Sequence, residues 1–206
     1  MYALDQDDLV APGALTALAD ALDSDATLSV VWGKEQDFGE RVTFEPHART
    51  LDPWLITYVN GLPVNSLVRR EALETAGGWQ ACRGYEDWSL WMAFAEHGLR
   101  GSRVDILQSF YRVTSTGMLS EVVDRHADIM RILHERHRAL FEARGRNRRR
   151  SSAPLRCKIL FPVIERLPVG EFTRHRMYRR VNDPVSSARA RLLGPRYEPT
   201  GLVGRT

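Results

Sequence analysis

Cysteine is scarce in this chain, since only Cys82 and Cys157 occur among 206 residues. A single possible pair is no disulfide framework, and neither cysteine has a partner at CxxC spacing, so a disulfide-stapled fold and a thiolate zinc site are disfavoured. No stretch approaches the roughly 18–20 apolar residues that cross a bilayer. Residues 1–8 also lack the basic and then apolar pattern of a secretory signal. These absences predict a globular protein of the reducing cytoplasm.

Acidic residues are scarce toward the end of the chain. The net charge of +3 is the sum of an acidic first part and a basic second part. Residues 144–206 hold 16 Lys and Arg against 4 Asp and Glu, whereas residues 1–143 hold 13 against 22. Basic segments attract phosphate-bearing partners such as anionic membranes or nucleic acid. We therefore predict an acidic domain over residues 1–143 and a basic tail over residues 144–206, partly disordered toward its end.

The basic run Arg146–Arg150 has two interpretations. The simpler one is a solvated charge run. The other is peripheral contact with an anionic membrane at the inner face of the cell membrane, helped by the apolar residues 159–161 and 163–164. Pro162 breaks this apolar segment and argues against a clean amphipathic stripe. The acidic character of residues 1–143 argues against nucleic acid as a partner.

Apolar runs and helix-period patterns alternate along residues 1–143, which is typical of an α/β fold. We expect strands at Tyr2–Leu4, Leu28–Trp32, Val64–Val68 and Val104–Val113. We expect helices after Pro12, at Arg70–Thr75 before Gly77 and Gly78, from Glu86 to just before Gly98, and over Leu119–Ala143. Residues 33–62 are expected to be loops with one short strand near Arg41–Phe44. Because the first strand opens the sequence, it needs a partner from another chain or from upstream residues.

Asp5, Asp7 and Asp8 form an acidic turn directly after the first expected strand. Ligands of open α/β sheets bind outside the carboxyl ends of the strands. Carboxylates one residue apart, such as Asp5 and Asp7, can face one divalent cation, and Mg2+ and Mn2+ prefer these hard oxygen ligands. The alternative is a structural turn in which the Asp8 side chain caps the following helix.

Glu86 and Asp87 stand at the expected start of a helix, after Gly84 and Tyr85. The helix dipole stabilises carboxylates there by about 0.3–1 kcal/mol, which requires no catalysis. The functional interpretation makes one carboxylate the base that removes a proton from an attacking hydroxyl.

Aromatic residues gather around this acidic pair. Trp79 and Tyr85 are candidates to stack on a sugar ring. Trp88 and Trp91 share a helical face with apolar residues, which favours a place in the core. The histidines further along, His126, His134 and His137, have no i, i+4 pairing for a metal and are expected at the surface or at an interface.

Three segments in this order resemble motifs of the family 2 glycosyltransferases. Residues 4–8, Leu-Asp-Gln-Asp-Asp, resemble the aspartate-x-aspartate turn of that family. Residues 65–73, Asn-Ser-Leu-Val-Arg-Arg-Glu-Ala-Leu, with Gly-Gly-Trp at 77–79, are similar to the segment that precedes the acceptor site. Residues 84–91, Gly-Tyr-Glu-Asp-Trp-Ser-Leu-Trp, resemble the Glu-Asp motif. The resemblance covers about residues 2–120 and implies a partial GT-A (nucleotide-diphospho-sugar transferase) fold, with a mixed sheet and flanking helices.

On the donor side, the resemblance implies that Asp5 and Asp7 handle the diphosphate of a nucleotide-sugar through Mg2+ or Mn2+, with Asp7 the main metal ligand. Arg112 is the further donor-binding candidate. Many members of the family continue here as Tyr-Arg-x-His, whereas this chain has Tyr-Arg-Val-Thr at residues 111–114. Threonine cannot replace imidazole as a metal ligand or as a charged phosphate partner.

On the acceptor side, the resemblance implies that Asp87 is the catalytic base and that Glu86 positions the acceptor or the base. Trp79 and Tyr85 are the acceptor-binding candidates, and the implied acceptor is a carbohydrate or a lipid-linked molecule. The implied reaction is inverting transfer from a nucleotide-sugar to a hydroxyl group.

The family's N-terminal portion, on the order of 80–100 residues of βαβ type, has no counterpart here. That portion grips the nucleotide base, so we expect the isolated chain to bind a nucleotide-sugar weakly or not at all. An alternative function is a non-catalytic remnant or a partner-binding subunit that retains the acceptor half. A basic-tailed nucleic-acid binder is a third and weaker alternative.

Overall fold

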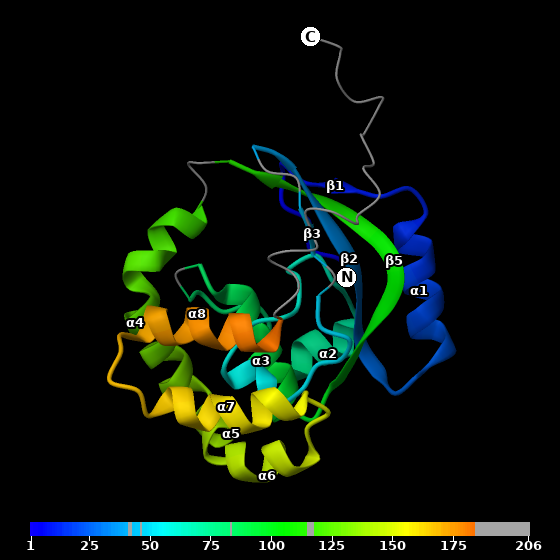
Figure 1. Cartoon of the computed structure of the whole chain (residues 1–206). Helices are drawn as coiled ribbons and strands as arrows, with labels where there is room; N and C mark the ends of the chain where they lie inside the picture. Colours follow the sequence, from blue (N-terminus) through cyan, green and yellow to red (C-terminus); the bar gives the residue numbers. More distant parts are fainter. Residues whose placement is uncertain (41–42, 46, 83, 115–117, 184–206) are drawn as a thin grey trace.

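The fold is a mixed α/β arrangement around one curved sheet (Figure 1). The structure, a computed structural model, describes residues 1–40, 43–45, 47–82, 84–114 and 118–183. Helix α1 covers one face of the sheet, and the other helices gather on the opposite side. The expectation of an α/β fold with a mixed sheet and flanking helices is therefore confirmed.

The sheet is built around two long parallel strands, β2 and β5. Its order is β1-β5-β2-β3, with β4 also pairing with β2, and these other pairings are antiparallel. The strands span Leu9–Val10 (β1), Leu28–Gly39 (β2), Phe44–Glu45 (β3), Leu67–Val68 (β4) and Arg100–Val113 (β5). The carboxyl ends of β2 and β5 lie side by side, since Phe38 pairs with Arg112.

The described residues include eight α-helices and one short 3-10 helix. They span Ala14–Ser24 (α1), Leu55–Thr57 (η1), Arg70–Thr75 (α2), Glu86–Glu96 (α3), Met118–Arg136 (α4), Arg138–Glu142 (α5), Arg144–Arg150 (α6), Leu155–Glu165 (α7) and Glu171–Asn182 (α8). No helix in this part of the chain has both the length and the apolar character that crossing a membrane requires.

Strand β2 separates two apolar layers because its side chains alternate between the faces of the sheet. Val31 packs with Leu18 and Leu22 of α1 on one face. Val30 and Trp32 point to the other face, into the main core beneath α2, α3 and α4. Trp32 fits there because its partner strand carries a glycine: a Cβ atom on Gly101 would lie 2.6 Å from the indole ring.

Helices α2 and α3 follow the sequence expectation closely. The α2 helix ends at two glycines with positive φ, Gly77 at 80° and Gly78 at 73°. The Gly78 N–H donates to the carbonyl of Leu73 at 2.9 Å, which closes the helix end. Trp88 and Trp91 of α3 are 2% and 0% exposed, so their predicted place in the core is confirmed.

Several expectations for the first half of the chain are wrong. Residues 2–4 form no strand of their own: Tyr2 makes an isolated antiparallel bridge to Leu67, and the paired strand begins only at Leu9. Strand β2 continues through Gly39 although residues 33–39 were expected to be a loop, because both neighbouring strands pair with its polar half. Asp8 does not cap α1, which begins after Gly13 without a side-chain cap.

The expected helix over 119–143 is two helices, since His137 separates α4 from α5. The expected short strand near 41–44 is β3, and residues 41 and 42 lie outside the described part. The disorder expected at the end of the chain concerns residues 184–206, which also lie outside the part of the chain that the structure describes.

Residues 144–182 are helical and pack against the rest of the molecule. Cys157, Phe161 and Ile164 of α7 share a buried cluster with Trp54 and Tyr58 beside η1. The apolar segment of α7 is not broken by Pro162, which lies inside the helix. Proline removes one backbone donor, so the carbonyl four residues earlier loses its helical partner. That carbonyl, of Lys158, instead accepts from the Arg148 guanidinium at 2.6 Å.

Candidate functional site

The acidic turn at residues 5–8 is anchored by Asp8, while Asp5 and Asp7 are exposed. The turn closes through the Asp8 N–H, which donates to the carbonyl of Asp5 at 3.1 Å. The Asp8 carboxylate is buried and accepts from the Arg112 backbone N–H at 2.9 Å and from Asn65 Nδ2 at 3.3 Å. Burial raises the pKa of Asp8, and these two hydrogen bonds oppose that rise. Asp8 thus fixes the turn against the end of β5.

Arg112 lies directly beside this turn. Its Nε donates to the backbone carbonyl of Asp7 at 3.1 Å, and its guanidinium carbon lies 4.4 Å from the centre of the Phe38 ring. The three candidates for donor binding, Asp5, Asp7 and Arg112, therefore lie together near the carboxyl ends of β2 and β5. One cation next to two exposed carboxylates is a suitable arrangement for a metal-bound phosphate, since the arginine donates to anionic oxygen.

A buried polar network lies beneath the turn and was not anticipated from the sequence. Glu35 of β2 accepts from Asn65 Nδ2 at 3.1 Å and from Ser109 Oγ at 2.7 Å. Its second oxygen lies 2.7 Å from His47 Nε2. Burial, and then the charge of Glu35, raise the pKa of Tyr2 to about 12. The only sequence signal was the polar run Glu35–Asp37 within an otherwise apolar strand.

Asp87 is held at the N-terminus of α3 by a side chain that sequence analysis did not single out. Asn60 Nδ2 donates to Asp87 Oδ2 at 2.7 Å. Burial raises the pKa of Asp87 to about 6, and the Trp88 N–H and Asn60 oppose that rise. A carboxyl group that titrates near neutral pH has the property required of a general base.

Glu86 faces the loop before the helix. Its two oxygens accept from the backbone N–H groups of Cys82 at 2.7 Å and Gly84 at 2.9 Å. These contacts hold the loop that leads into Asp87, so Glu86 positions its neighbour through the backbone.

The two acceptor-binding candidates have different environments. Trp79 is 42% exposed and meets Trp91 edge-on, with 6.4 Å between the ring centres. Tyr85 is half-buried: its hydroxyl lies 2.8 Å from His126 Nδ1, and its ring packs on Trp88 at 5.2 Å. Burial raises the pKa of Tyr85 to about 12. Trp79 is therefore available to a ligand, whereas Tyr85 is already engaged.

Helix α8 packs beside this region through His175. The His175 ring lies 4.7 Å from that of His126 on α4 and 5.5 Å from that of Trp88 on α3. His126 and His137 are 1% and 3% exposed, so of the two positions expected for them, surface or interface, the surface one is wrong, whereas His134 is exposed. Both buried rings lie where helices meet, which their spacing alone did not reveal.

A second histidine network joins α3, α4 and α5. His137 Nε2 lies 3.0 Å from Ser89 Oγ, and its Nδ1 lies 2.8 Å from Glu96. Ser89, His137 and Glu96 thus follow one another in the order of a catalytic triad, in which a serine nucleophile is followed by a histidine base and an acidic residue. However, Ser89 is only 3% exposed, and its hydroxyl also accepts from Arg136 at 3.0 Å. The network therefore serves to join the helices.

The acidic turn and Asp87 are connected by one short loop. Asn65 binds Asp8 and Asn60 binds Asp87, as described above. Because these asparagines are five residues apart, their Cα atoms lie within about 18 Å of each other. The segment from Asn60 to Asn65 therefore links the contacts of the two acidic groups.

Two surface hollows lie elsewhere. One of about 150 Å3 lies beside Ser89 and His137, and one of about 320 Å3 lies beside Thr50 and Gly101. Among the described residues, no group of three or more His, Cys, Asp or Glu is arranged to hold a metal ion. Any metal at the turn would therefore rely on the two aspartates together with oxygens of a ligand.

The half-buried His175 predicts that the stability of the fold depends on pH. Burial, followed by repulsion from His126 and Arg179, lowers the pKa of His175 to about 4. The unfolded chain takes up this proton near pH 6.5 and the folded chain only near pH 4. Stability from this group is therefore present above about pH 6.5 and falls as the pH drops toward 4, by up to about 3 kcal/mol.

Urea unfolding at pH 5 and pH 7.5 measures this effect. In the unmodified chain, the free energy of unfolding should be higher at pH 7.5 than at pH 5. We expect His175→Gln to reduce this difference by about 2 kcal/mol. His97→Gln, at an exposed position, is the matched control and should keep the full difference. An unchanged difference in His175→Gln would show that His175 is protonated in the folded chain.

Comparison with known proteins gives no further assignment: no protein-family model matches the chain, and no curated protein matches it.

Proposed function

We propose that this chain takes part in inverting, metal-dependent transfer of a sugar from a nucleotide-sugar to an acceptor hydroxyl, within a partial GT-A fold of family 2 type. The observation that carries the proposal is the partly buried Asp87 carboxyl at a helix N-terminus, held by Asn60 and next to aromatic residues, with its pKa raised to about 6. A short loop connects it to the exposed pair Asp5 and Asp7 beside Arg112. Candidate groups for both halves of a glycosyl transfer are therefore linked through residues 60–65.

The residues of the turn fit Mg2+ or Mn2+. Asp5 and Asp7 are exposed hard-oxygen ligands, and two carboxylates leave coordination positions for diphosphate oxygens. When bound, such an ion neutralises the nucleoside diphosphate leaving group. Asp8 holds the backbone of the turn, and Arg112 supplies a further positive charge for the phosphates.

Asp87 acts on the acceptor. Its carboxylate takes the proton of the acceptor hydroxyl while the hydroxyl oxygen bonds to the anomeric carbon and the bond to the diphosphate breaks. Attack from the face opposite the leaving group inverts that carbon. Asn60 keeps Asp87 Oδ2 in place, and the exposed Trp79 offers a ring face to the sugar of the acceptor.

The metal step is tested by adding Mn2+ with a uridine or guanosine diphosphate and observing paramagnetic broadening of backbone amide signals. We expect the signals of residues 5–8 and 112 to broaden first. Asp7→Asn should reduce the Mn2+ affinity at least about tenfold, since it removes the main charged ligand. The exposed Asp20→Asn on α1 is the control. Broadening spread evenly over the acidic surface would contradict a site at the turn.

A non-catalytic, acceptor-binding subunit is the second candidate. It is favoured by Thr114, where the related motif has histidine, and by Tyr85, whose hydroxyl is engaged by His126. The two functions separate in one assay: an acceptor-binding subunit binds an oligosaccharide but neither hydrolyses nor transfers from any nucleotide-sugar supplied with Mn2+. Metal-dependent turnover that Asp87→Asn removes would exclude it.

A further inference from the structure

Helix α7 is apolar on both sides, although only one side is covered. Cys157, Phe161 and Ile164 are buried against the body. The other side carries the α7 stripe, defined as four side chains that are 41–70% exposed: Leu155, Ile159, Leu160 and Val163. Leu155, Ile159 and Val163 follow one another at i, i+4 and i+8, so they line one side of the helix over about 12 Å.

These four are half of the large apolar side chains that stand exposed in the described part of the chain. Single exposed apolar residues are ordinary, but a contiguous group on one helix marks an interaction surface. Pro162 does not interrupt the stripe, because α7 continues through it.

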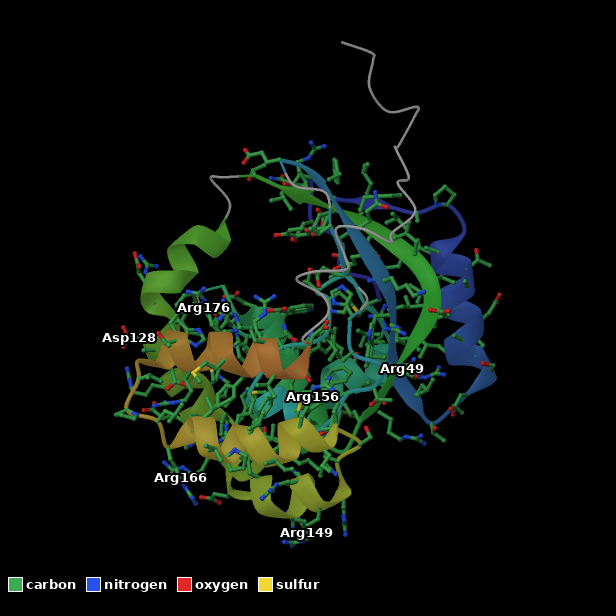
Figure 2. All side chains as sticks on the ribbon, in the orientation of Figure 1. Arg49, Asp128, Arg149, Arg156, Arg166 and Arg176 are labelled. Carbon is green, nitrogen blue, oxygen red and sulfur yellow. The ribbon has the colours of Figure 1, made fainter. Side chains whose placement is uncertain are left out.

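Positive charge dominates the segment that carries the α7 stripe. Residues 144–183 hold twelve Lys and Arg against three Asp and Glu. Among the acidic residues, Glu165 is paired with Arg144 at 2.5 Å. Figure 2 shows Arg149 on α6 and Arg166 after α7 extending outward at the end of the molecule that these helices form.

Several of these arginines have no internal role. Arg146, Arg149, Arg150 and Arg166 are exposed and form no side-chain hydrogen bond or ion pair with a described residue. Arg156, by contrast, is fixed by the carbonyls of Val181 and Asn182. The unpaired arginines are therefore available to an external anion, at the end of the molecule that α6 and α7 form.

We propose that α7 docks on the surface of an anionic lipid bilayer, with the α7 stripe in the region between headgroups and acyl chains and the arginines of α6 and residue 166 on the lipid phosphates. A helix with apolar residues on one side and basic residues around them lies in the interface plane, and its binding grows with anionic lipid content. This charge pattern selects a bilayer over a second copy of the chain, because two copies would bring the same arginines together. The docking is independent of sugar transfer.

The test is flotation of the full chain with vesicles of phosphatidylcholine alone and with one quarter phosphatidylglycerol. We expect binding to the anionic vesicles that weakens at least tenfold without phosphatidylglycerol. Replacing two stripe residues together, Ile159→Ser and Val163→Ser, should weaken binding at least tenfold. Replacing Arg149 and Arg150 by Gln should weaken it roughly fivefold for each arginine removed. Both double variants alter exposed side chains, and circular dichroism checks that they fold.

Leu15→Ser is the matched control, since Leu15 is 45% exposed on α1, on the other side of the sheet. It should bind like the unmodified chain. The proposal is overturned if the unmodified chain does not float with anionic vesicles, or if the stripe variant floats as well as the control. It is also overturned if the stripe substitutions instead convert a dimer in solution to a monomer, which would assign the stripe to a second copy.

Discussion

Replacing Asp87 by asparagine is expected to reduce sugar transfer at least about a hundredfold while making the chain more stable at pH 8. The loss of activity follows because a positioned base contributes about 10²–10⁴ in rate. The gain in stability follows because burial raises the pKa of Asp87 to about 6, from an ordinary value of 3.8. This group favours folding below about pH 4, and that contribution is lost as the pH rises through 6, at a cost of about 3 kcal/mol.

Urea unfolding of Asp87→Asn and of the unmodified chain at pH 4 and pH 8 measures this cost. The free energy of unfolding of the variant, relative to that of the unmodified chain, should rise by about 3 kcal/mol from pH 4 to pH 8. Asp128→Asn is the control, because Asp128 is exposed on α4 (Figure 2). Undiminished transfer by Asp87→Asn would remove Asp87 as the base. A variant that is less stable at pH 8 would show that the charged carboxylate is well solvated.

Replacing Arg144 by alanine is expected to destabilise the chain by about 2–4 kcal/mol, since it breaks a partly buried hydrogen-bond network. The guanidinium carbon lies over the rings of Tyr58 and Phe141, 4.2 and 4.5 Å from their centres. It also donates to the backbone carbonyl of Thr57 at 2.7 Å, to the Thr57 hydroxyl at 2.9 Å and to Glu165. Thr57 is 1% exposed, so alanine would leave its carbonyl without that donor.

The same change tests whether residues 144–182 belong to the fold. We expect the amides of α7 and α8 to lose protection from hydrogen exchange in Arg144→Ala before those of the sheet do. Arg149→Ala, a change of the same kind on α6 at an exposed site, should alter stability by less than about 0.5 kcal/mol. Equal stability of the two variants would mean that the contacts of Arg144 contribute nothing.

Short, locally determined elements could be predicted from the sequence. Helix α2 has the expected bounds Arg70–Thr75, because two glycines with positive φ end it. Helix α3 begins at Glu86, where acidic residues suit a helix N-terminus. In both cases neighbouring residues carry the signal.

Features that depend on distant partners could not be predicted. The buried Glu35 requires Asn65 and Ser109 from other elements, and nothing near residue 35 in sequence indicates them. The basic segment beginning at Arg144 was predicted to be a tail because composition does not reveal that Phe161 packs with Trp54, over a hundred residues earlier. The pairing of Asp87 with Asn60 was missed for the same reason, although Asp87 itself was named.

The central claim is that Asp87, held by Asn60 at the start of α3, is a partly buried carboxyl group able to accept a proton near neutral pH. Carbon-13 NMR titration of the Asp87 side-chain carbon, with Asp128 as the exposed reference, measures this directly. The account predicts a pKa of about 6 for Asp87. A pKa at or below about 4, the ordinary value for aspartate, would contradict it.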